Sequence, residues 1–336
     1  MLAAILLCLP CAAAPSVSAQ SAILIDGLTG EVLFAEHEDQ KSLIASTTKI
    51  MTALVILENK NLDETVTIPT EAVGIEGSSL YLEAGDKLTI RELLYGMMLH
   101  SGNDAAVALA LLCSGSVEAF ADLMNEKAAE LGLANTHFVN PSGLDGEDHY
   151  STAKDLAIMT AYAMKNPEFV QIVSTKTITI GERRLKNHNR LLWTLEGAIG
   201  VKTGYTKAAG RILVSAASRN NRCLIAVTIH DGNDWKDHSA LYEWAFCRYE
   251  PYEVFRSGEC VCSIELADGS RVQLIAEEAF SFSLTEGERL EVKPLYPKVA
   301  ISSGAYGTPA GVGGVYLNET LVGTMKLLWG EKEAEP

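Results

Sequence analysis

The spacing of hydrophobic residues along the chain changes from strand-like to helical and back again. Near the N-terminus, AILIDG and EVLFAE are short apolar runs separated by LTG, a pattern that predicts a β-hairpin. The run from Ile50 to Leu57 is apolar at almost every position, which favours a helix buried on most sides. The sequence TIRELLYGMMLH then places Thr89 and Glu92 in the spacing of a capping box, so a second helix is expected to begin there and to end at Ser101-Gly102.

Three further helices and three strands are predicted downstream. The sequences NDAAVALALLC, SVEAFADLMNEKAAELGL and STAKDLAIMTAYAMKN have helical periodicity. From Gly200 the period changes, and GVKTGYT, RILVSAAS and CLIAVTIH predict strands, the last two joined by a tight turn at Asn220-Asn221. A helix from about Asp234 to Cys247 follows. This order predicts an α+β domain with one antiparallel sheet, in which the first and last strands meet, flanked by helices.

Beyond Pro251 the helical period is lost. EVFRSGECVCSIELADGSRVQLIAEEAFSFSL and GVYLNETLVGTMKLL are short strand-like runs divided by Gly-rich turns, which predicts a second, all-β domain. The predicted organisation is a leader at 1–19, the α+β domain at 20–250, the β-rich domain at 251–330 and an acidic tail at 331–336.

The first 19 residues resemble an export signal. They carry no charge, contain an apolar stretch from Leu2 to Leu9, and end in Val17-Ser18-Ala19, which resembles a signal-peptidase site. A basic segment at the start is missing. A membrane-spanning helix is a weaker interpretation, because prolines at 10 and 15 leave far fewer than the roughly 20 apolar residues that a span requires.

Charge and cysteine content exclude several classes of protein. The formal net charge of −16 argues against a nucleic-acid partner and against broad docking on an anionic membrane, since both need a basic surface. Outside the leader, an odd number of cysteines argues against a full disulfide framework. Cys113, Cys223 and Cys247 lie in apolar runs and are expected to be buried, and Cys260 and Cys262 are interpreted as structural residues of a strand.

Three short motifs carry the candidate chemistry. Ser46 and Lys49 form S-x-x-K at the start of the apolar helix, where residues three apart share a face and can form a hydrogen bond. Alone, this is an ordinary capping serine followed by a solvated lysine. Ser101 and Asn103 form S-x-N between two helices, and 202–204 read K-T-G at a strand start. In this order the three motifs resemble those of penicillin-binding proteins and class A β-lactamases, in which the middle motif is S-D-N where this sequence has S-G-N.

Longer stretches extend the resemblance over essentially the whole chain after the leader. IASTTKIMTALVILE, SSLYLEAGDKLTIRELLYGMMLHSGNDAAVALA, FVNPSGLDGEDHYSTAKDLA, NHNRLL and VKTGYTKAAGRILVSAA resemble the low-molecular-mass D-alanyl-D-alanine carboxypeptidases of the penicillin-binding protein 5 type, in the serine peptidase S11 family. VYLNETLVGTMKLL is similar to the C-terminal domain of that family. The resemblance implies a serine β-lactamase/DD-peptidase-like domain followed by a small all-β domain.

Cleavage of a peptide bond through an acyl-enzyme needs an activated hydroxyl, a base and donors for the oxyanion. Ser46 is the candidate nucleophile, and its place at a helix N-terminus puts partial positive charge beside the oxyanion. Lys49 can accept the proton only when its amine is neutral. Burial and the positive charge of Lys202 would both lower the pKa of Lys49, which makes sense of two lysines in one pocket.

The family resemblance implies roles for the other motif residues. Ser101 would relay the proton to the leaving amine, and Asn103 would hold a substrate amide. The terminal carboxylate of the substrate would be bound by Lys202 and Thr203. Gly204 would let the substrate backbone approach the strand, and the N–H of Tyr205 would be the second oxyanion donor beside that of Ser46. The implied substrates are peptidoglycan pentapeptide stems, with β-lactams as covalent inhibitors and no metal or cofactor.

Other polar clusters have simpler interpretations. His230–His238, HDGNDWKDH, could suggest a metal site, but no matching ligand motif occurs elsewhere and Asn233 or Asp234 makes an ordinary helix cap. His149 is expected to contact the loop or helix start near 151–152 rather than to act as a base, since no serine lies in G-x-S-x-G. The 187 and 189 asparagines are expected to shape the loop before the K-T-G strand.

Alternative functions remain open at this point. A β-lactamase shares the acylation apparatus, but no E-x-x-L-N-like stretch lies between Asn103 and Lys202 to supply the deacylating Glu of class A enzymes. A non-catalytic cell-wall scaffold is disfavoured because every catalytic position is filled. Endopeptidase or transpeptidase activity uses the same residues, so the sequence does not separate these reactions from carboxypeptidase activity.

The C-terminus departs from the family pattern. Members of the family commonly end in an amphipathic helix that rests on the membrane, whereas this sequence ends in LLWGEKEAEP, which is too short and acidic for such an anchor. The sequence therefore predicts an exported protein that works outside the cytoplasmic membrane without a strong C-terminal anchor.

Overall fold

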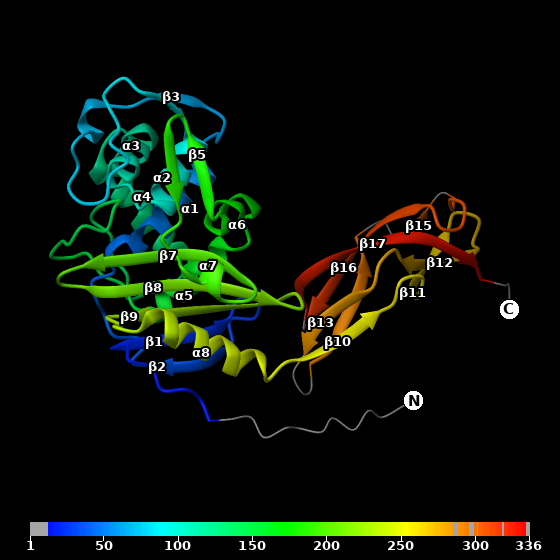
Figure 1. Cartoon of the computed structure of the whole chain (residues 1–336). Coiled ribbons are helices and arrows are strands. Elements are labelled where there is room, and N and C mark those ends of the chain that lie inside the picture. Colours follow the sequence, from blue (N-terminus) through cyan, green and yellow to red (C-terminus); the bar gives the residue numbers. More distant parts are fainter. Residues whose placement is uncertain (1–12, 285–287, 296–298, 301, 318, 334–336) are drawn as a thin grey trace. The chain divides into compact units, whose positions relative to one another are not determined.

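The computed structural model describes residues 13–284, 288–295, 299–300, 302–317 and 319–333 (Figure 1). The chain divides into two compact units. The first comprises Met1–Ser218 and Cys223–Ala245, and the second comprises Arg219–Arg222 and Phe246–Pro336. The division therefore falls a few residues before the expected boundary at 250, and the second unit also takes in a short segment from within the first.

The first unit is built on a five-stranded sheet with the strand order β2-β1-β9-β8-β7 (Figure 1). β1 is antiparallel to β2 and β9, and β7 is antiparallel to β8. The N-terminal hairpin thus meets the last of the later strands, as predicted, while the K-T-G strand β7 lies at an edge. The strands are β1 (Ser21–Asp26), β2 (Val32–Glu36), β7 (Ala198–Thr206), β8 (Gly210–Arg219) and β9 (Arg222–Ile229).

Alternation of side chains along the inner strands allows this sheet to be covered on both faces. Val214 and Val227 belong to the main hydrophobic core. Their neighbours Ser215 and Thr228 instead contact His238 of the helix α8 (Asp234–Phe246) at 2.6 and 3.0 Å. Apolar side chains of these strands therefore face the helical block. The side chains that face α8 form a small, fully buried polar network.

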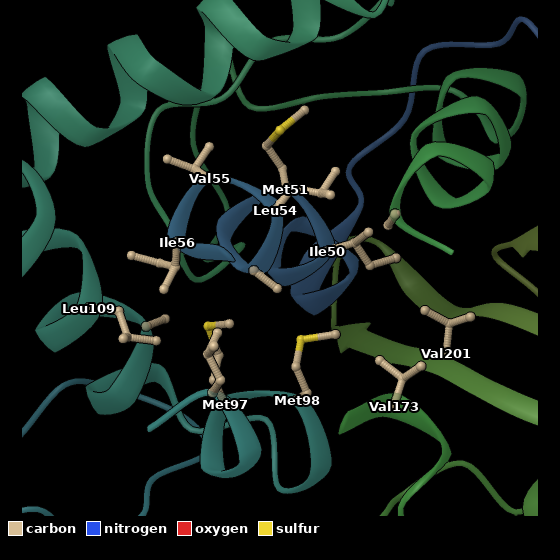
Figure 2. Packing of buried hydrophobic residues seen from close by; sticks show 14 of the residues in the cluster. Ile50, Met51, Leu54, Val55, Ile56, Met97, Met98, Leu109, Val173 and Val201 are labelled. Carbon is tan, nitrogen blue, oxygen red and sulfur yellow. The ribbon is translucent and has the colours of Figure 1, made fainter. Parts of the chain in front are cut away.

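The helical block surrounds α1, which is apolar on most sides as predicted. Figure 2 shows Met51 and Val55 pointing away from Met97 and Met98, which pack against the opposite side of α1. Side-chain caps define several of the helix starts, including the predicted capping box at Thr89. The helices are α1 (Lys49–Asn59), α2 (Ile90–Leu99), α3 (Asn103–Ser114), α4 (Val117–Glu130), α5 (Ala153–Ala163), α6 (Pro167–Ser174) and α7 (Leu191–Thr194).

Several short elements were not predicted. These are two 3-10 turns, Ala45–Thr48 and Thr70–Ala72, the helices α6 and α7, and two small hairpins, because each is too short to show a clear period. Within the described residues, no helix on its own has both the length and the apolar character to cross a membrane. The helices α3 and α4 meet both criteria only when they are counted as one segment, and the chain bends by 85° between them. The hairpin strands are β3 (Thr65–Thr67), β4 (Lys87–Thr89), β5 (Thr177–Ile180) and β6 (Arg183–Lys186).

The N-terminal segment contacts the first unit before the predicted leader ends. The apolar stretch at residues 2–9 lies outside the described residues, but Ser18 is described. Its N–H donates to Asp237 Oδ2 at 2.5 Å, and its hydroxyl lies 2.7 Å from Asp231 Oδ1. A cut after Ala19 would remove both donors from two buried carboxylates, which is costly. If the predicted leader is removed, these contacts favour a cut before Ser18.

The second unit contains only strands among its described elements, in agreement with the predicted all-β domain. It has a two-stranded sheet and a six-stranded sheet of order β14-β16-β17-β12-β11-β15. β17 continues through Lys332, so the expected tail at 331–336 begins inside the last strand. The strands are β10 (Glu250–Phe255), β11 (Cys260–Leu266), β12 (Arg271–Ala276), β13 (Phe280–Leu284), β14 (Leu290–Pro294), β15 (Val299–Ala300), β16 (Pro309–Leu317) and β17 (Thr320–Lys332).

The cysteines outside the predicted leader are all free thiols. Cys113 and Cys223 are partly buried, which fits their apolar surroundings. Cys247 is exposed, so the expectation that it is a buried residue was wrong. It follows Phe246, the last residue of α8, where the chain leaves the first unit, so the apolar run containing Cys247 does not continue into the core.

Candidate active site

Ser46 and Lys49 lie one turn apart where the chain enters the central helix. Ser46 belongs to the 3-10 turn Ala45–Thr48, and Lys49 is the first residue of α1. Neither N-cap residue of these two helices makes a side-chain capping bond. The Ser46 hydroxyl instead lies 3.0 Å from Lys49 Nζ, as the S-x-x-K spacing predicted.

The Lys49 amine has three polar neighbours, which accept its three N–H groups when it is charged and leave its lone pair facing Ser46 when it is neutral. Asn103 Oδ1 at 2.7 Å and the main-chain oxygen of Ser142 at 2.5 Å can only accept, so each takes one N–H of the amine. A neutral amine has two N–H groups and one lone pair. The lone pair is then left for the hydroxyl proton of Ser46, which is the arrangement that a general base requires.

The surroundings of Lys49 favour this neutral state. Its side chain is fully buried. Burial and then the positive charge of Lys202 lower the pKa of Lys49 well below its ordinary value, while Asp104 acts in the opposite direction. The prediction that burial and Lys202 would depress this pKa is confirmed.

Ser101 and Lys202 form a second hydroxyl–amine pair. Ser101, in the short connection between α2 and α3, has a φ of 65° and is nearly buried. Lys202 Nζ donates to its hydroxyl at 3.1 Å and to the main-chain oxygen of Thr203 at 2.8 Å. Burial lowers the pKa of Lys202 to about 7. Because Ser101 Oγ accepts from Lys202, its own proton is available to a further acceptor.

The edge strand β7 passes close to the nucleophile at Gly204. A Cβ atom added to Gly204 would lie 3.2 Å from the main-chain oxygen of Ile44 and 3.3 Å from the nitrogen of Ser46, which is tighter than ordinary packing. Glycine therefore allows the strand to approach the Ser46 turn. Thr203 and Tyr205 flank it and line the same pocket as Ser46.

Asn103 lies in the site against the amine of Lys49. Both ends of its amide are bound by the protein, Oδ1 by Lys49 and Nδ2 by the main-chain oxygen of Glu76 at 2.6 Å. The side chain is nearly buried and is not among the pocket-lining residues. Asn103 therefore positions Lys49, and its contact with a substrate amide stays a prediction.

A pocket of about 460 Å³ opens beside Ser46. Of the predicted residues, Ser46, Ser101, Thr203, Gly204 and Tyr205 line it. Lys49 and Lys202 lie behind this lining rather than in it. The remaining lining residues were not predicted: Ser78, His188, Arg211, Ile212, Asp234 and Trp235.

Two buried polar residues that the sequence analysis did not assign to the site support it from behind. Asp104 accepts from the backbone N–H groups of Leu80 and Leu82, and so fixes the segment beside Ser78. His149 lies against Thr48 in the Ser46 turn, with Nε2 2.7 Å from Thr48 Oγ1. His149 therefore contacts the Ser46 turn through Nε2 and the loop through Nδ1, which accepts from the N–H of Val139.

The acidic and histidine-containing segment 230–238 is divided among separate partners. Asp234 pairs with Arg211, and His238 lies between Ser215 and Thr228. Within the described part of the chain, no cluster of His, Cys, Asp or Glu has the arrangement of a metal site. The asparagines at 187 and 189 shape the loop as expected: Asn187 Nδ2 donates to the main-chain oxygens of Val173 and Thr175, and Asn189 Oδ1 accepts from the N–H of Leu191 at the start of α7.

Comparison with known proteins agrees with this geometry. Residues 10–233 match the peptidase S11 family, described as D-alanyl-D-alanine carboxypeptidase. The D-alanyl-D-alanine carboxypeptidase DacF of Bacillus subtilis is 36% identical over 286 residues, which cover 80% of this chain and 73% of that protein.

Solved structures extend the similarity to both units. Penicillin-binding protein 5 from Haemophilus influenzae is 28% identical, with a TM-score of 0.69, covering 96% of this chain and 99% of that chain. A mutant of the Streptomyces K15 DD-transpeptidase is 36% identical, with a TM-score of 0.67, covering 69% of this chain and 99% of that one. The chain belongs to the peptidase S11 family of D-alanyl-D-alanine carboxypeptidases, which are serine peptidases.

Proposed function

We propose that this enzyme removes the terminal D-alanine from peptidoglycan pentapeptide stems through an acyl-enzyme on Ser46. The observation that carries the proposal is the hydroxyl of Ser46 beside a buried amine whose other two contacts accept N–H groups. That arrangement supplies a nucleophile and its base in one pocket. A lysine with a purely structural role is expected to be exposed or paired with a carboxylate, because burial of an unpaired charge is costly. Within the described part of the chain, none of the hydrogen bonds of the Lys49 amine is to a carboxylate, which fits a functional role.

Acylation follows from these contacts. Lys49 takes the hydroxyl proton as Ser46 Oγ bonds to the carbonyl carbon of the penultimate D-alanine. The peptide C–N bond then breaks, and the Ser101 hydroxyl gives its proton to the leaving nitrogen while it takes one from the Lys202 amine. Water next attacks the ester carbonyl and gives a proton through Ser101 to the now neutral Lys202. The bond to Ser46 Oγ breaks, and Ser46 regains the proton that Lys49 had taken.

The oxyanion would be bound between two backbone N–H groups. Gly204 brings β7 against the Ser46 turn, so the N–H groups of Ser46 and Tyr205 are the donors that this approach supports. Backbone donors fixed in the fold need no reorganisation as negative charge develops on the carbonyl oxygen. Neither donor depends on a side chain.

Transpeptidation is the second candidate, since the Streptomyces K15 relative is named a DD-transpeptidase. Both reactions share the acyl-enzyme and differ in whether water or an amine attacks it. Digestion of pentapeptide-bearing peptidoglycan, followed by mass spectrometry, distinguishes them. We expect tetrapeptide stems and free D-alanine; new cross-links would indicate transpeptidation, and cleaved cross-links an endopeptidase.

Selectivity for a chain end provides a quantitative test. We expect a peptide ending in D-Ala-D-Ala to be cleaved with a kcat/KM roughly a hundredfold above that of its C-terminal amide, since amidation removes charge-assisted hydrogen bonds of about 1.5–3 kcal/mol each. Steady-state kinetics on the two peptides measures the ratio. Equal rates would contradict the carboxypeptidase assignment and favour endopeptidase action.

We also propose that the protein is exported and acts on the cell-wall side of the cytoplasmic membrane, where its substrate lies. We expect the leader to be cleaved upstream of Ser18, because Ser18 donates hydrogen bonds to the buried carboxylates of Asp231 and Asp237 and so remains part of the folded protein. N-terminal sequencing of protein recovered from an expressing cell tests this. A mature chain that begins at Gln20 would overturn the placement of the cut, and a protein retained in the cytoplasm would overturn export.

A further inference from the structure

Two cysteines lie two residues apart in the second unit, at the start of the strand β11. Cys260 is exposed and Cys262 is partly buried, and both are free thiols. A cysteine that serves only for packing behaves as a small buried hydrophobe. That explanation can account for Cys262, but it does not account for Cys260, whose side chain is open to solvent.

A β-bulge separates the two cysteines. On the partner strand β12, Cys260 lies opposite Ile275 and Cys262 lies opposite Leu274, so two steps along β11 match one step along β12. Val261 is therefore the extra residue of the bulge. A bulge bends its strand and redirects side chains, which brings the positions on either side of the extra residue closer together than in a regular strand.

The spacing of the two residues falls within the range of a disulfide bond. In a regular strand, Cα atoms two residues apart are separated by about 6.4–6.8 Å, which is twice the rise per residue. Disulfides span Cα–Cα distances of about 4.4–6.8 Å. Because the bulge shortens the separation of Cys260 and Cys262, a bond between their sulfurs needs little movement of the backbone.

The side chain of Cys260 is directed toward Cys262. Its Sγ donates a weak hydrogen bond to the main-chain oxygen of Cys262 at 3.7 Å. Burial, and then the neighbouring Cys260, raise the pKa of the Cys262 thiol. Partial burial and the carboxylates of Glu333 and Glu259 raise the pKa of Cys260. The two thiols are therefore neighbours that are mostly protonated at neutral pH, and alkaline conditions increase the thiolate fraction of both.

We propose that Cys260 and Cys262 form a reversible dithiol–disulfide pair that exchanges with small-molecule disulfides. Cys260 is the attacking thiol because it is the more exposed of the two, and Cys262 is the resolving thiol. An exposed disulfide is labile rather than a permanent structural bond. The pair uses no residue of the Ser46 site, so this chemistry is separate from peptide cleavage.

The exchange takes two steps. The thiolate of Cys260 attacks one sulfur of glutathione disulfide, the S–S bond of the reagent breaks, and one glutathione leaves and takes up the proton that Cys260 lost. Cys262 then gives up its proton and attacks the Cys260 sulfur of the mixed disulfide, and the second glutathione leaves as a thiol. Two electrons pass to the reagent, so the protein dithiol is oxidised to a disulfide while glutathione disulfide is reduced to two glutathione molecules.

The test treats the full-length protein with glutathione disulfide at mildly alkaline pH, alkylates the remaining thiols and maps the tryptic peptides by mass spectrometry. Residues 257–271 form one tryptic peptide that contains both cysteines of the pair and no other cysteine. We expect this peptide to lose the mass of two hydrogen atoms and to escape alkylation. Excess reduced glutathione should return it to the form that is alkylated on both cysteines.

Cys247 is the matched control within the same chain. It is an exposed free thiol, lies in a different tryptic peptide and has no cysteine within two residues of it. The same treatment should therefore leave Cys247 as a mixed disulfide with glutathione. Cys262→Ser removes the resolving thiol and should stop the reaction at a mixed disulfide on Cys260. Cys260→Ser removes the attacking thiol and should leave Cys262 mostly open to alkylation.

Three results would overturn the proposal. A wild-type peptide 257–271 that carries one or two glutathione molecules would show that its thiols react independently. Alkylation of both of its cysteines, with Cys247 converted to the mixed disulfide, would show that the pair does not exchange. A disulfide that excess reduced glutathione does not reopen would be a fixed structural bond.

Discussion

Benzylpenicillin is expected to form a covalent adduct on Ser46, and Ser46→Ala is expected to form none. A β-lactam presents an amide and a carboxylate in the arrangement of the D-Ala-D-Ala end, so its acyl group is transferred to the same hydroxyl. Removal of the nucleophile should also reduce peptide cleavage by about six orders of magnitude, as in other serine peptidases. Intact-protein mass spectrometry after incubation with the antibiotic measures the adduct.

Ser78→Ala is the matched control, because Ser78 lines the same pocket as Ser46. The main-chain oxygen of Ser78 accepts from the N–H of Asn103, and this contact does not depend on the side chain that is replaced. We expect this variant to be labelled normally. An adduct that persists in Ser46→Ala would remove Ser46 from the mechanism. An adduct that disappears within minutes from the wild type would indicate a β-lactamase.

Replacement of Lys49 by Met is expected to slow acylation by about 10²–10⁴-fold, the usual contribution of a general base. The fold should be retained, because Met has a high helix propensity and fills a similar volume without a buried amine. Lys60→Met, at the C-terminal end of the same helix, is the control and should acylate at the wild-type rate. Stopped-flow or quenched labelling with a chromogenic β-lactam gives the rate constants.

The pH dependence of acylation provides a second measurement of the same residue. Only the neutral amine of Lys49 accepts a proton, and its lowered pKa raises the neutral fraction at a given pH above that of an ordinary lysine. The wild-type rate should therefore increase with pH through that lowered pKa and then become constant. Lys49→Met should lack this ascending limb, and a rate near that of the wild type would assign the base elsewhere.

The sequence predicted the elements whose signals are local. The capping box at Thr89 and the tight turn at 220–221, where φ is 46° and 62°, are properties of a few consecutive residues. The S-x-x-K pair was predicted for the same reason, because helical spacing alone brings Ser46 and Lys49 together. The three motifs then gave the order in which helix, loop and strand surround the site.

The remaining parts of the site depend on contacts between distant segments. Arg211 and Asp234 are 23 residues apart, and nothing in GRILVSAA or HDGNDWKDH indicates that they pair beside Ser46. The burial of Lys202 follows from packing against Ser101, which the K-T-G pattern does not encode. For the same reason the contacts of the Asn103 amide with the amine of Lys49 and the main-chain oxygen of Glu76 were not predicted.

The position of β7 at the edge of its sheet has a consequence for the chemistry of inhibitors. A strand with a neighbour on one side only presents backbone N–H and C=O groups on the other, and an extended peptide can add to them as a further strand. Such pairing recognises the shape of a main chain and is nearly indifferent to side chains, which suits a ligand that carries only methyl groups. Short β-strand mimetics ending in a carboxylate should therefore compete reversibly with β-lactams, without any reactive group.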